Sequence, residues 1–317
     1  MLKKYLCLLG AIVISIAYSH AQQIIFTPQW TPQSQFAGYY AAQENGYYAE
    51  AGLDVRFEHP TTSYSSISML KDGTCDIISC ELIQAMITTD NDLRLVNLLQ
   101  TTQHSTLVLI ARAKNVTQLS DLAECRIGTW KVGFSEIPHM IDEEQQLDIE
   151  WIKLLGPLNF YISGAIDATL AKSYNELILF SMSGIKPGSV LYFSEHGYDF
   201  PEDGLYVTEE YFNNNRELCL LFAEASRKGW DWVRRNPEKA LDIVMEYVKK
   251  GNVATNRYNQ KWMLDAILKA QEDIKGGLPS YELKEDGFNQ LNEALSKYGY
   301  ISKPVVYDRF TGGSHEK

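Results

Sequence analysis

Residues 24–57 read IIFTPQWTPQSQFAGYYAAQENGYYAEAGLDVRF and contain one complete unit of an α/β pattern. The apolar run 24–26 predicts a strand, and Ser34 is a residue type that caps the helix expected after it. The Asn-Gly pair at 45–46 marks the end of that helix, and apolar and charged residues then alternate over 53–57, as in a second strand. A strand, a helix and a strand in this order are typical of a doubly wound α/β sheet.

The same alternation continues along the chain and defines two α/β units. In the first unit we expect strands at 76–79, 93–99 and 106–111 and helices at 64–72 and 81–89. In the second unit we expect strands at 126–129, 150–154, 167–169, 190–193 and 205–207 and helices at 137–146, 159–164 and 174–182. The C-terminal third is mostly helical, with apolar stripes over 217–235 and, after Asn236-Pro237, through residue 248.

Two α/β units followed by a long helical region predict two lobes that face each other across a cleft. The chain is expected to cross between the lobes near 104–112 and again near 195–207. Residues 22–108 and 201–317 would then form the first lobe, and residues 109–200 the second. Ligands of open α/β sheets bind at the carboxyl ends of the strands, so the loops after the strands are expected to line the cleft.

The first 21 residues have the three parts of a secretory signal peptide. Two lysines at positions 3 and 4 precede an apolar run over 6–17, and Ser19-His20-Ala21 offers small residues at the two positions that a signal peptidase reads. Cleavage would leave an exported mature chain of residues 22–317, and a retained signal anchor is the alternative. No later stretch has the roughly 18 uninterrupted apolar residues of a membrane helix, so the mature chain is not expected to enter a membrane.

The composition excludes several classes of function. The 317 residues carry 29 Lys and Arg against 40 Asp and Glu, a net charge of −11, and so acidic a surface repels nucleic acid. Five cysteines without a Cys-x-x-Cys spacing are too few for a disulfide framework. The composition therefore indicates a compact, acidic globular protein that does not bind nucleic acid. We expect it to be a monomer whose partner is a small molecule.

Known catalytic motifs are missing from the sequence. It contains no Gly-x-Ser-x-Gly, His-Glu-x-x-His, Gly-x-Gly-x-x-Gly or EF-hand pattern, and no two histidines stand four residues apart. We therefore expect no catalytic residue, no metal site and no cofactor. Residues 128–133 have the glycine spacing of a phosphate-binding loop, but Phe134 stands where such a loop needs its lysine, before Ser135. What is left is a glycine-bearing turn, which either presents backbone N–H groups to a ligand or merely joins a strand to a helix.

Aromatic and amide side chains gather near the start of the mature chain. Trp30 stands in a polar loop with Gln33 close by, so its ring can stack on a planar ligand while the amide bonds the edge of that ligand. Packing in the core is the alternative for Trp30, and it is the interpretation that we take for Tyr47 and Tyr48. His104 stands at the first expected crossing between the lobes, where it either contacts ligand or has a structural role.

Several short motifs follow one another in a fixed order. The first are Trp30-Thr31-Pro32-Gln33, Ala37-Gly38-Tyr39, Asn45-Gly46-Tyr47-Tyr48 and Ala51-Gly52-Leu53-Asp54-Val55. Later ones are Leu70-Lys71-Asp72-Gly73-Thr74-Cys75-Asp76, Ser163-Gly164-Ala165-Ile166-Asp167-Ala168, Tyr174-Asn175 and Gly229-Trp230. In this order they resemble the periplasmic solute-binding proteins of ABC importers, of the alkanesulfonate- and aminopyrimidine-binding type that also includes thiamine-pyrimidine synthases. The resemblance covers about residues 24–248.

The resemblance implies the type II periplasmic binding protein fold, in which two α/β lobes close on a ligand and are joined by a hinge that the chain crosses twice. It also implies a function, that of the periplasmic substrate-binding component of an ABC importer with a membrane permease as partner. The ligand would be a small planar or polar metabolite, similar to a thiamine-precursor pyrimidine, to riboflavin or to a sulfonate.

Two other functions stay open, a thiamine-pyrimidine synthase-like enzyme that consumes pyridoxal phosphate and a ligand sensor for a membrane partner. The synthases carry a cysteine-rich segment where this chain reads Asp199-Phe200-Pro201-Glu202-Asp203, and this difference argues against the enzyme, as does the export signal. Pyrimidine binders of the family usually place an acidic residue shortly before the Tyr-Asn pair. Here the segment 170–173 reads Leu-Ala-Lys-Ser, which argues against that mode of pyrimidine recognition.

Ligand contacts are expected from strand and helix ends of both lobes. The first lobe would flank the ligand with aromatic rings and bond its polar edges, and the second would contribute a helix start and a far wall. The predicted ligand-binding residues are Trp30, Gln33, Tyr39, Ser79, Cys80, His104, Trp130, Ser135, Tyr174 and Asn175.

Overall fold

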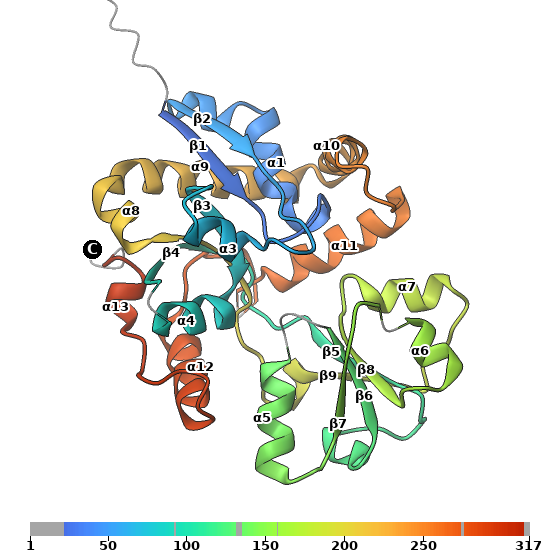
Figure 1. Ribbon diagram of the computed structural model, residues 1–317. Coiled ribbons are helices and arrows are strands. Elements are labelled where there is room, and N and C mark those ends of the chain that lie inside the picture. The colour runs from blue at the N-terminus through green and yellow to red at the C-terminus, as the bar shows by residue number, and fades with distance from the viewer. Residues whose placement is uncertain (1–21, 92, 131–134, 157, 274–275, 314–317) are drawn as a thin grey trace, which may run out of the picture.

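The computed structural model describes residues 22–91, 93–130, 135–156, 158–273 and 276–313. Within them it contains two five-stranded sheets, each flanked by helices, which form two lobes (Figure 1). The predicted signal peptide and residues 131–134 of the glycine-bearing turn lie outside the described residues.

The sheet of the first lobe has the strand order β2-β1-β3-β10-β4. Its strands are β1 (Gln22–Thr27), β2 (Leu53–Phe57), β3 (Ile77–Glu81), β4 (Leu95–Gln100) and β10 (Asp203–Thr208). β1 is parallel to β2 and β3, whereas β10 is antiparallel to both of its neighbours. In β2 buried and exposed residues alternate, as expected of an edge strand with one covered face.

The sheet of the second lobe has the strand order β7-β6-β8-β5-β9. Its strands are β5 (Leu107–Ala111), β6 (Arg126–Trp130), β7 (Glu150–Leu154), β8 (Ala168–Lys172) and β9 (Ser189–Tyr192). β8 is parallel to β6 and antiparallel to β5. Both β5 and β8 are buried along their whole length, so Lys172 comes at the end of a strand without an exposed face.

Helices flank each sheet. Those of the first lobe are α1 (Ala37–Glu44), α2 (Tyr47–Glu50), α3 (Ser66–Lys71), α4 (Leu82–Asp90), α8 (Glu209–Asn214), α9 (Arg216–Arg235), α10 (Pro237–Lys250), α11 (Arg257–Ala270), α12 (Glu285–Lys297) and α13 (Tyr307–Phe310). Those of the second are α5 (Glu136–Gln145), α6 (Leu158–Ser163) and α7 (Glu176–Met182). Three 3-10 turns complete the described elements, η1 (Ser34–Phe36), η2 (Leu119–Leu122) and η3 (Phe193–His196).

Of three local predictions, two need correction. Ser34 does not cap a helix, because it lies inside η1 and its backbone N–H donates to Gln260 Oε1 at 2.7 Å. The end predicted at Asn45-Gly46 is confirmed, because α1 ends at Glu44 with Asn45 as its C-cap, and Gly46, with a left-handed φ of 78°, separates it from α2. The helix predicted at 174–182 begins only at Glu176, since the strand before it is longer than predicted.

α1 crosses α9 at close range, because both helices have a glycine at the contact. A Cβ on Gly229 would lie 2.0 Å from the carbonyl oxygen of Gly38, and a Cβ on Gly38 would lie 2.1 Å from the Trp230 ring. That ring is buried and meets the ring of Tyr39 edge-on, with 5.7 Å between centroids. The Gly-Trp motif therefore packs the helices of the first lobe against each other.

The chain passes twice between the two sheets. Residues 101–106 lead from β4 to β5, and residues 197–202 lead from η3 back to β10. Because β10 inserts between β3 and β4, the second segment returns to the interior of the first sheet. In the ranges that the structure describes, no helix is both long and apolar enough to cross a membrane.

Candidate functional site

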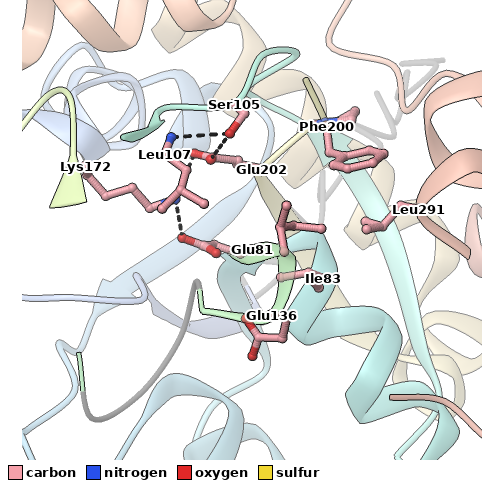
Figure 2. A pocket seen from close by; sticks show the side chains of 11 residues that line it. Glu81, Ile83, Ser105, Leu107, Glu136, Lys172, Phe200, Glu202 and Leu291 are labelled. Carbon is pink, nitrogen blue, oxygen red and sulfur yellow. Dashed lines mark hydrogen bonds and ion pairs between the residues drawn. The ribbon is translucent and has the colours of Figure 1, made fainter. Parts of the chain in front are cut away.

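A buried lysine joins the two lobes. Lys172 stands at the carboxyl end of β8, and its Nζ lies 2.8 Å from Glu81 Oε1 and 3.0 Å from Glu202 Oε2 (Figure 2). Glu81 ends β3 of the first lobe, and Glu202 ends the second segment between the lobes. Lys172 is only 4% exposed, so this ion pair is shielded from water. A buried charge of this kind needs its partners, because an unpaired ion in the interior is costly.

Burial and neighbouring charges shift the pKa values of Lys172 and Glu81. Burial opposes the charged form of Lys172, but the carboxylates of Glu202 and Glu81 outweigh it, so the pKa of the ammonium is raised. Burial is also the main reason that the pKa of Glu81 is raised, although Lys172 acts against it. Lys172 therefore stays charged, and burial disfavours the charged form of Glu81.

Glu202 also ties together the two segments that run between the lobes. Its carboxylate accepts from Ser105 Oγ and from the backbone N–H of Thr106, both at 2.9 Å. Nearby, Asp199 accepts from His104 Nδ1 at 2.6 Å and from the Ser105 N–H at 2.7 Å. The hydrogen bond with Asp199 raises the pKa of His104. His104, in the segment that leads from β4 to β5, is therefore bonded to Asp199 in the segment that leads back to β10.

A second buried carboxylate lies just inside the first lobe. Asp203, 7% exposed, accepts from Gln29 Nε2 at 2.9 Å and from Gln35 Nε2 at 2.7 Å. Gln35 in turn accepts from Gln33 Nε2 at 2.6 Å. Burial is the main cause that raises the pKa of Asp203. An amide-rich polar network therefore backs the carboxyl ends of β1 and β3.

The structure spreads the predicted residues of the first lobe over different environments. Trp30 is 47% exposed at the surface, and its carbonyl accepts from His59 Nδ1 at 2.6 Å. The Oγ of Ser79 accepts from the Gln29 N–H at 3.0 Å. Tyr39 lies in the core, where its ring meets that of Phe26 edge-on at 5.0 Å. Cys80 is also buried, and burial raises the pKa of its thiol well above the usual value.

The predicted residues of the second lobe lie near its strand and helix ends. Trp130 ends β6 and is partly exposed, and its Nε1 has no hydrogen-bond partner among the described residues. Ser135 precedes the first residue of α5 without capping it. Tyr174 is buried and joins the core cluster of the first lobe, although it follows a strand of the second. Asn175 donates from Nδ2 to Glu176 Oε1 at 3.0 Å.

A small cavity of about 40 Å³ lies between the lobes beside the Lys172 ion pair. Its polar lining comprises Glu81, Ser105, Glu136, Lys172 and Glu202, and Phe200 and Leu291 are among its apolar residues (Figure 2). None of these seven is among the predicted site residues, but three directly follow one, Glu81 after Cys80, Ser105 after His104 and Glu136 after Ser135.

Further contacts join the lobes around this cavity. Gln84 Nε2 of α4 donates to Glu136 Oε1 of α5 at 2.8 Å, and Lys297 of α12 pairs with Glu144 of α5 at 2.9 Å. On another side, Trp262 Nε1 of α11 donates to a backbone carbonyl just after β8 at 3.4 Å. α4, α11 and α12 of the first lobe thus all touch the second, which defines a closed arrangement of the two.

Two signals in the sequence pointed toward the charged residues that the prediction missed. Lys172 lies in the segment 170–173, in which the resemblance led us to expect an acid, and the structure extends the predicted strand so that β8 ends at this lysine. The segment that replaces the cysteines of the synthases carries Asp199, Glu202 and Asp203, and all three acids make buried or hinge contacts. Their shared location could not be inferred without knowing that β10 enters the middle of the first sheet.

Comparison with known proteins gives a family and a fold. The family model described as NMT1/THI5 like matches residues 33–240. A formylaminopyrimidine-binding protein of Halalkalibacterium halodurans is 23% identical over 288 residues, 87% of this chain and 86% of that protein. The riboflavin-binding protein RibY of Chloroflexus aurantiacus is 18% identical over 334 residues, 93% of this chain and 88% of that protein.

Solved structures resemble the whole two-lobed arrangement. The periplasmic aliphatic sulphonate binding protein SsuA from Escherichia coli has a TM-score of 0.65 at 12% identity, over 90% of this chain and 91% of that one. The desulfurization enzyme DSZB has a TM-score of 0.61 at 14% identity, over 90% of this chain and 96% of that one. These likenesses confirm the predicted periplasmic binding protein fold, and at this level of identity they show the fold alone.

Proposed function

Because this chain belongs to the NMT1/THI5-like family, we propose that it is the substrate-binding component of an ABC-type importer. It would capture a small planar or polar metabolite between its lobes and deliver it unchanged to a membrane permease. The two relatives named as binders of a formylaminopyrimidine and of riboflavin support a planar nitrogen heterocycle as ligand. Export by the predicted signal peptide would place the chain in the periplasm, where such a component works.

One observation carries the proposal. Polar side chains from facing strand ends of the two sheets meet at a single place, with Lys172 of β8 held between Glu81 of β3 and Glu202. A ligand bound there touches both lobes only when they are closed, so its binding energy shifts the population toward the closed form. That is how a two-lobed protein captures a solute without chemical change.

The enzyme alternative is less well supported by the site. Cys80 is the buried cysteine nearest to the cleft carboxylates, and burial keeps its thiol protonated, which makes it a poor nucleophile. The segment at 199–203 supplies carboxylates to the hinge and to the first lobe where the synthases have cysteines. Incubation with pyridoxal phosphate and iron should therefore leave the histidines of this chain intact, whereas histidine loss with release of a pyrimidine would favour the enzyme.

The direct test is the identity and fate of the bound molecule. Mass spectrometry of protein extracted natively from its host should find one small molecule, and incubation with excess protein should return that molecule with the same mass. Conversion of the molecule to another compound would contradict a transport role.

The site proposal also makes Trp30 a ligand contact. Its ring is 47% exposed and packs little against the core, so Trp30→Ala should leave the melting temperature unchanged and weaken binding of the co-purified molecule at least tenfold in calorimetry. Phe160→Ala is a matched control, because Phe160 is 45% exposed on α6. Equal affinity of the Trp30 variant and the wild type would remove Trp30 from the site.

A further inference from the structure

Among the described residues, carboxylates outnumber cations around the interlobe cavity. Glu81 and Glu202 approach it from the first lobe and the hinge, Glu136 from the start of α5, and Lys172 is the single cation among the described residues that line it. The ammonium of Lys172 is already engaged at 2.8 Å and 3.0 Å by two of these carboxylates. A ligand anion would therefore find a negative lining and no uncommitted ammonium.

Two of the carboxylates can accept further hydrogen bonds. Glu136 Oε1 accepts from Gln84, but its Oε2 is buried and has no hydrogen-bond partner in the described part of the chain. Among the described residues Glu81 pairs with Lys172 through Oε1, and a carboxylate can accept about four hydrogen bonds. Glu202 differs from both, because three donors reach it in addition to Lys172, the Oγ of Ser105 and both the N–H and the Oγ1 of Thr106.

Glu81 and Glu136, the two carboxylates that can accept further hydrogen bonds, come from opposite lobes. Glu81 ends β3 of the first lobe and Glu136 opens α5 of the second, and both line the same cavity (Figure 2). A buried acceptor without a donor is costly, so a ligand that brings N–H groups stabilises the closed lobes and an anion destabilises them. Burial raises the pKa of Glu81, which is the shift expected of a carboxylate whose charge is undercompensated.

We propose that the cleft recognises its ligand through an amine or a protonated nitrogen that donates to Glu81 and Glu136, one carboxylate from each lobe, and that it rejects sulfonates and other anions. The inference rests on the proposed function, because it takes the cleft to be the ligand site. The ligand then belongs to one chemical class, compounds with an amine or a protonated nitrogen, and residues of both lobes recognise it. Lys172 then balances the charge of Glu81 and Glu202 and does not itself hold the ligand.

Calorimetry with matched probes tests the assignment. The probes are 5-aminomethyl-2-methylpyrimidin-4-amine, which is cationic at neutral pH, its analogue 4-amino-2-methylpyrimidine-5-carboxylate, and ethanesulfonate. Wild-type protein should bind the aminomethyl compound at least tenfold more tightly than the carboxylate and should not bind ethanesulfonate. Glu81→Gln and Glu136→Gln should each reduce that preference at least tenfold. Glu143→Gln, on an exposed position of the same helix α5, should leave it unchanged.

The possible results separate the inference from the proposed function. If the wild type binds the carboxylate or ethanesulfonate more tightly than the aminomethyl compound, the inference is overturned, but the proposed binding function stands. The same conclusion follows if a Glu81→Gln protein that melts like the wild type keeps the wild-type preference. A co-purified molecule without N–H groups or positive charge overturns the inference as well. If the folded wild type binds none of the probes and no small molecule co-purifies with it, the proposed function fails and the inference with it.

Discussion

The ion pair of His104 and Asp199 joins the two segments that run between the lobes, with 2.6 Å between Nδ1 and Oδ2. Since the hydrogen bond with Asp199 raises the pKa of His104 in the folded protein, folding favours the protonated ring. The stabilisation is therefore complete below the unfolded pKa of about 6.5 and is lost as the pH rises through the folded pKa.

His104→Asn should accordingly destabilise the protein by about 0.5–1 kcal/mol at pH 5.5 and by much less at pH 8.5, as measured by urea unfolding. The same comparison in an Asp199→Asn background should show little dependence on pH, because the partner that raises the pKa of His104 is gone. A destabilisation that is equal at both pH values would contradict this role of the pair.

Lys172 is the residue whose loss should cost most. Lys172→Met leaves the buried carboxylates of Glu81 and Glu202 without their cation, and breaking a buried pair in this way typically costs about 3–5 kcal/mol. The loss should be smaller at low pH. With the pKa of Glu81 raised above its unfolded value, the folded state takes up a proton there, so stability returns as the pH falls.

A double variant separates charge from packing at this position. Lys172→Met combined with Glu81→Gln should recover part of the free energy of unfolding at pH 7.5, because it removes one of the uncompensated charges. If the double variant is no more stable than Lys172→Met alone, the ion pair is not the reason for the loss.

Among the elements, the contact between α1 and α9 makes the sharpest prediction. A methyl group at Gly229 would lie 2.0 Å from the carbonyl oxygen of Gly38, and both helices are fixed by the core around Trp230. Gly229→Ala should thus destabilise the protein by about 1–3 kcal/mol or more in urea unfolding, as overpacking does. Gly156→Ala is the control, since no atom of the described residues beyond its chain neighbours lies within 4 Å of a Cβ there, and its effect should stay within about 0.5 kcal/mol. Equal effects of the two changes would contradict the close packing of the helices.

The individual elements were largely accessible from sequence, because their signals are local. The fully apolar β5 and the alternating β2 were predicted close to their observed bounds, and so was α9 with its buried stripe. The pairing of strands, in contrast, depends on residues that lie far apart in the sequence. The sequence marks β10 as a strand, but nothing in its own residues shows that it lies between β3 and β4, since its partners are about 100 residues away in the chain.

At the scale of the whole molecule, the dependence of strand pairing on residues far apart in the chain explains why the prediction missed the charged residues of the site. The predicted residues were chosen for aromatic or polar character at strand and helix ends, and the structure puts several of them beside the cavity instead of in it. Glu81, Lys172 and Glu202 were not among the predicted site residues. Only the arrangement of two sheets and two crossing segments buries them together, and no short motif encodes that arrangement.

The central claim is that the two lobes close on a small molecule and release it intact. The most direct measurement is the distance distribution between spin labels at Ser181 on α7 and Glu246 on α10, both exposed and in different lobes, with Cys125 replaced by serine. Addition of the co-purified molecule should shift the distribution to shorter distances, and the molecule should be recovered afterwards with its original mass. A distribution that does not move when the molecule binds, or a molecule recovered with a different mass, would contradict the account.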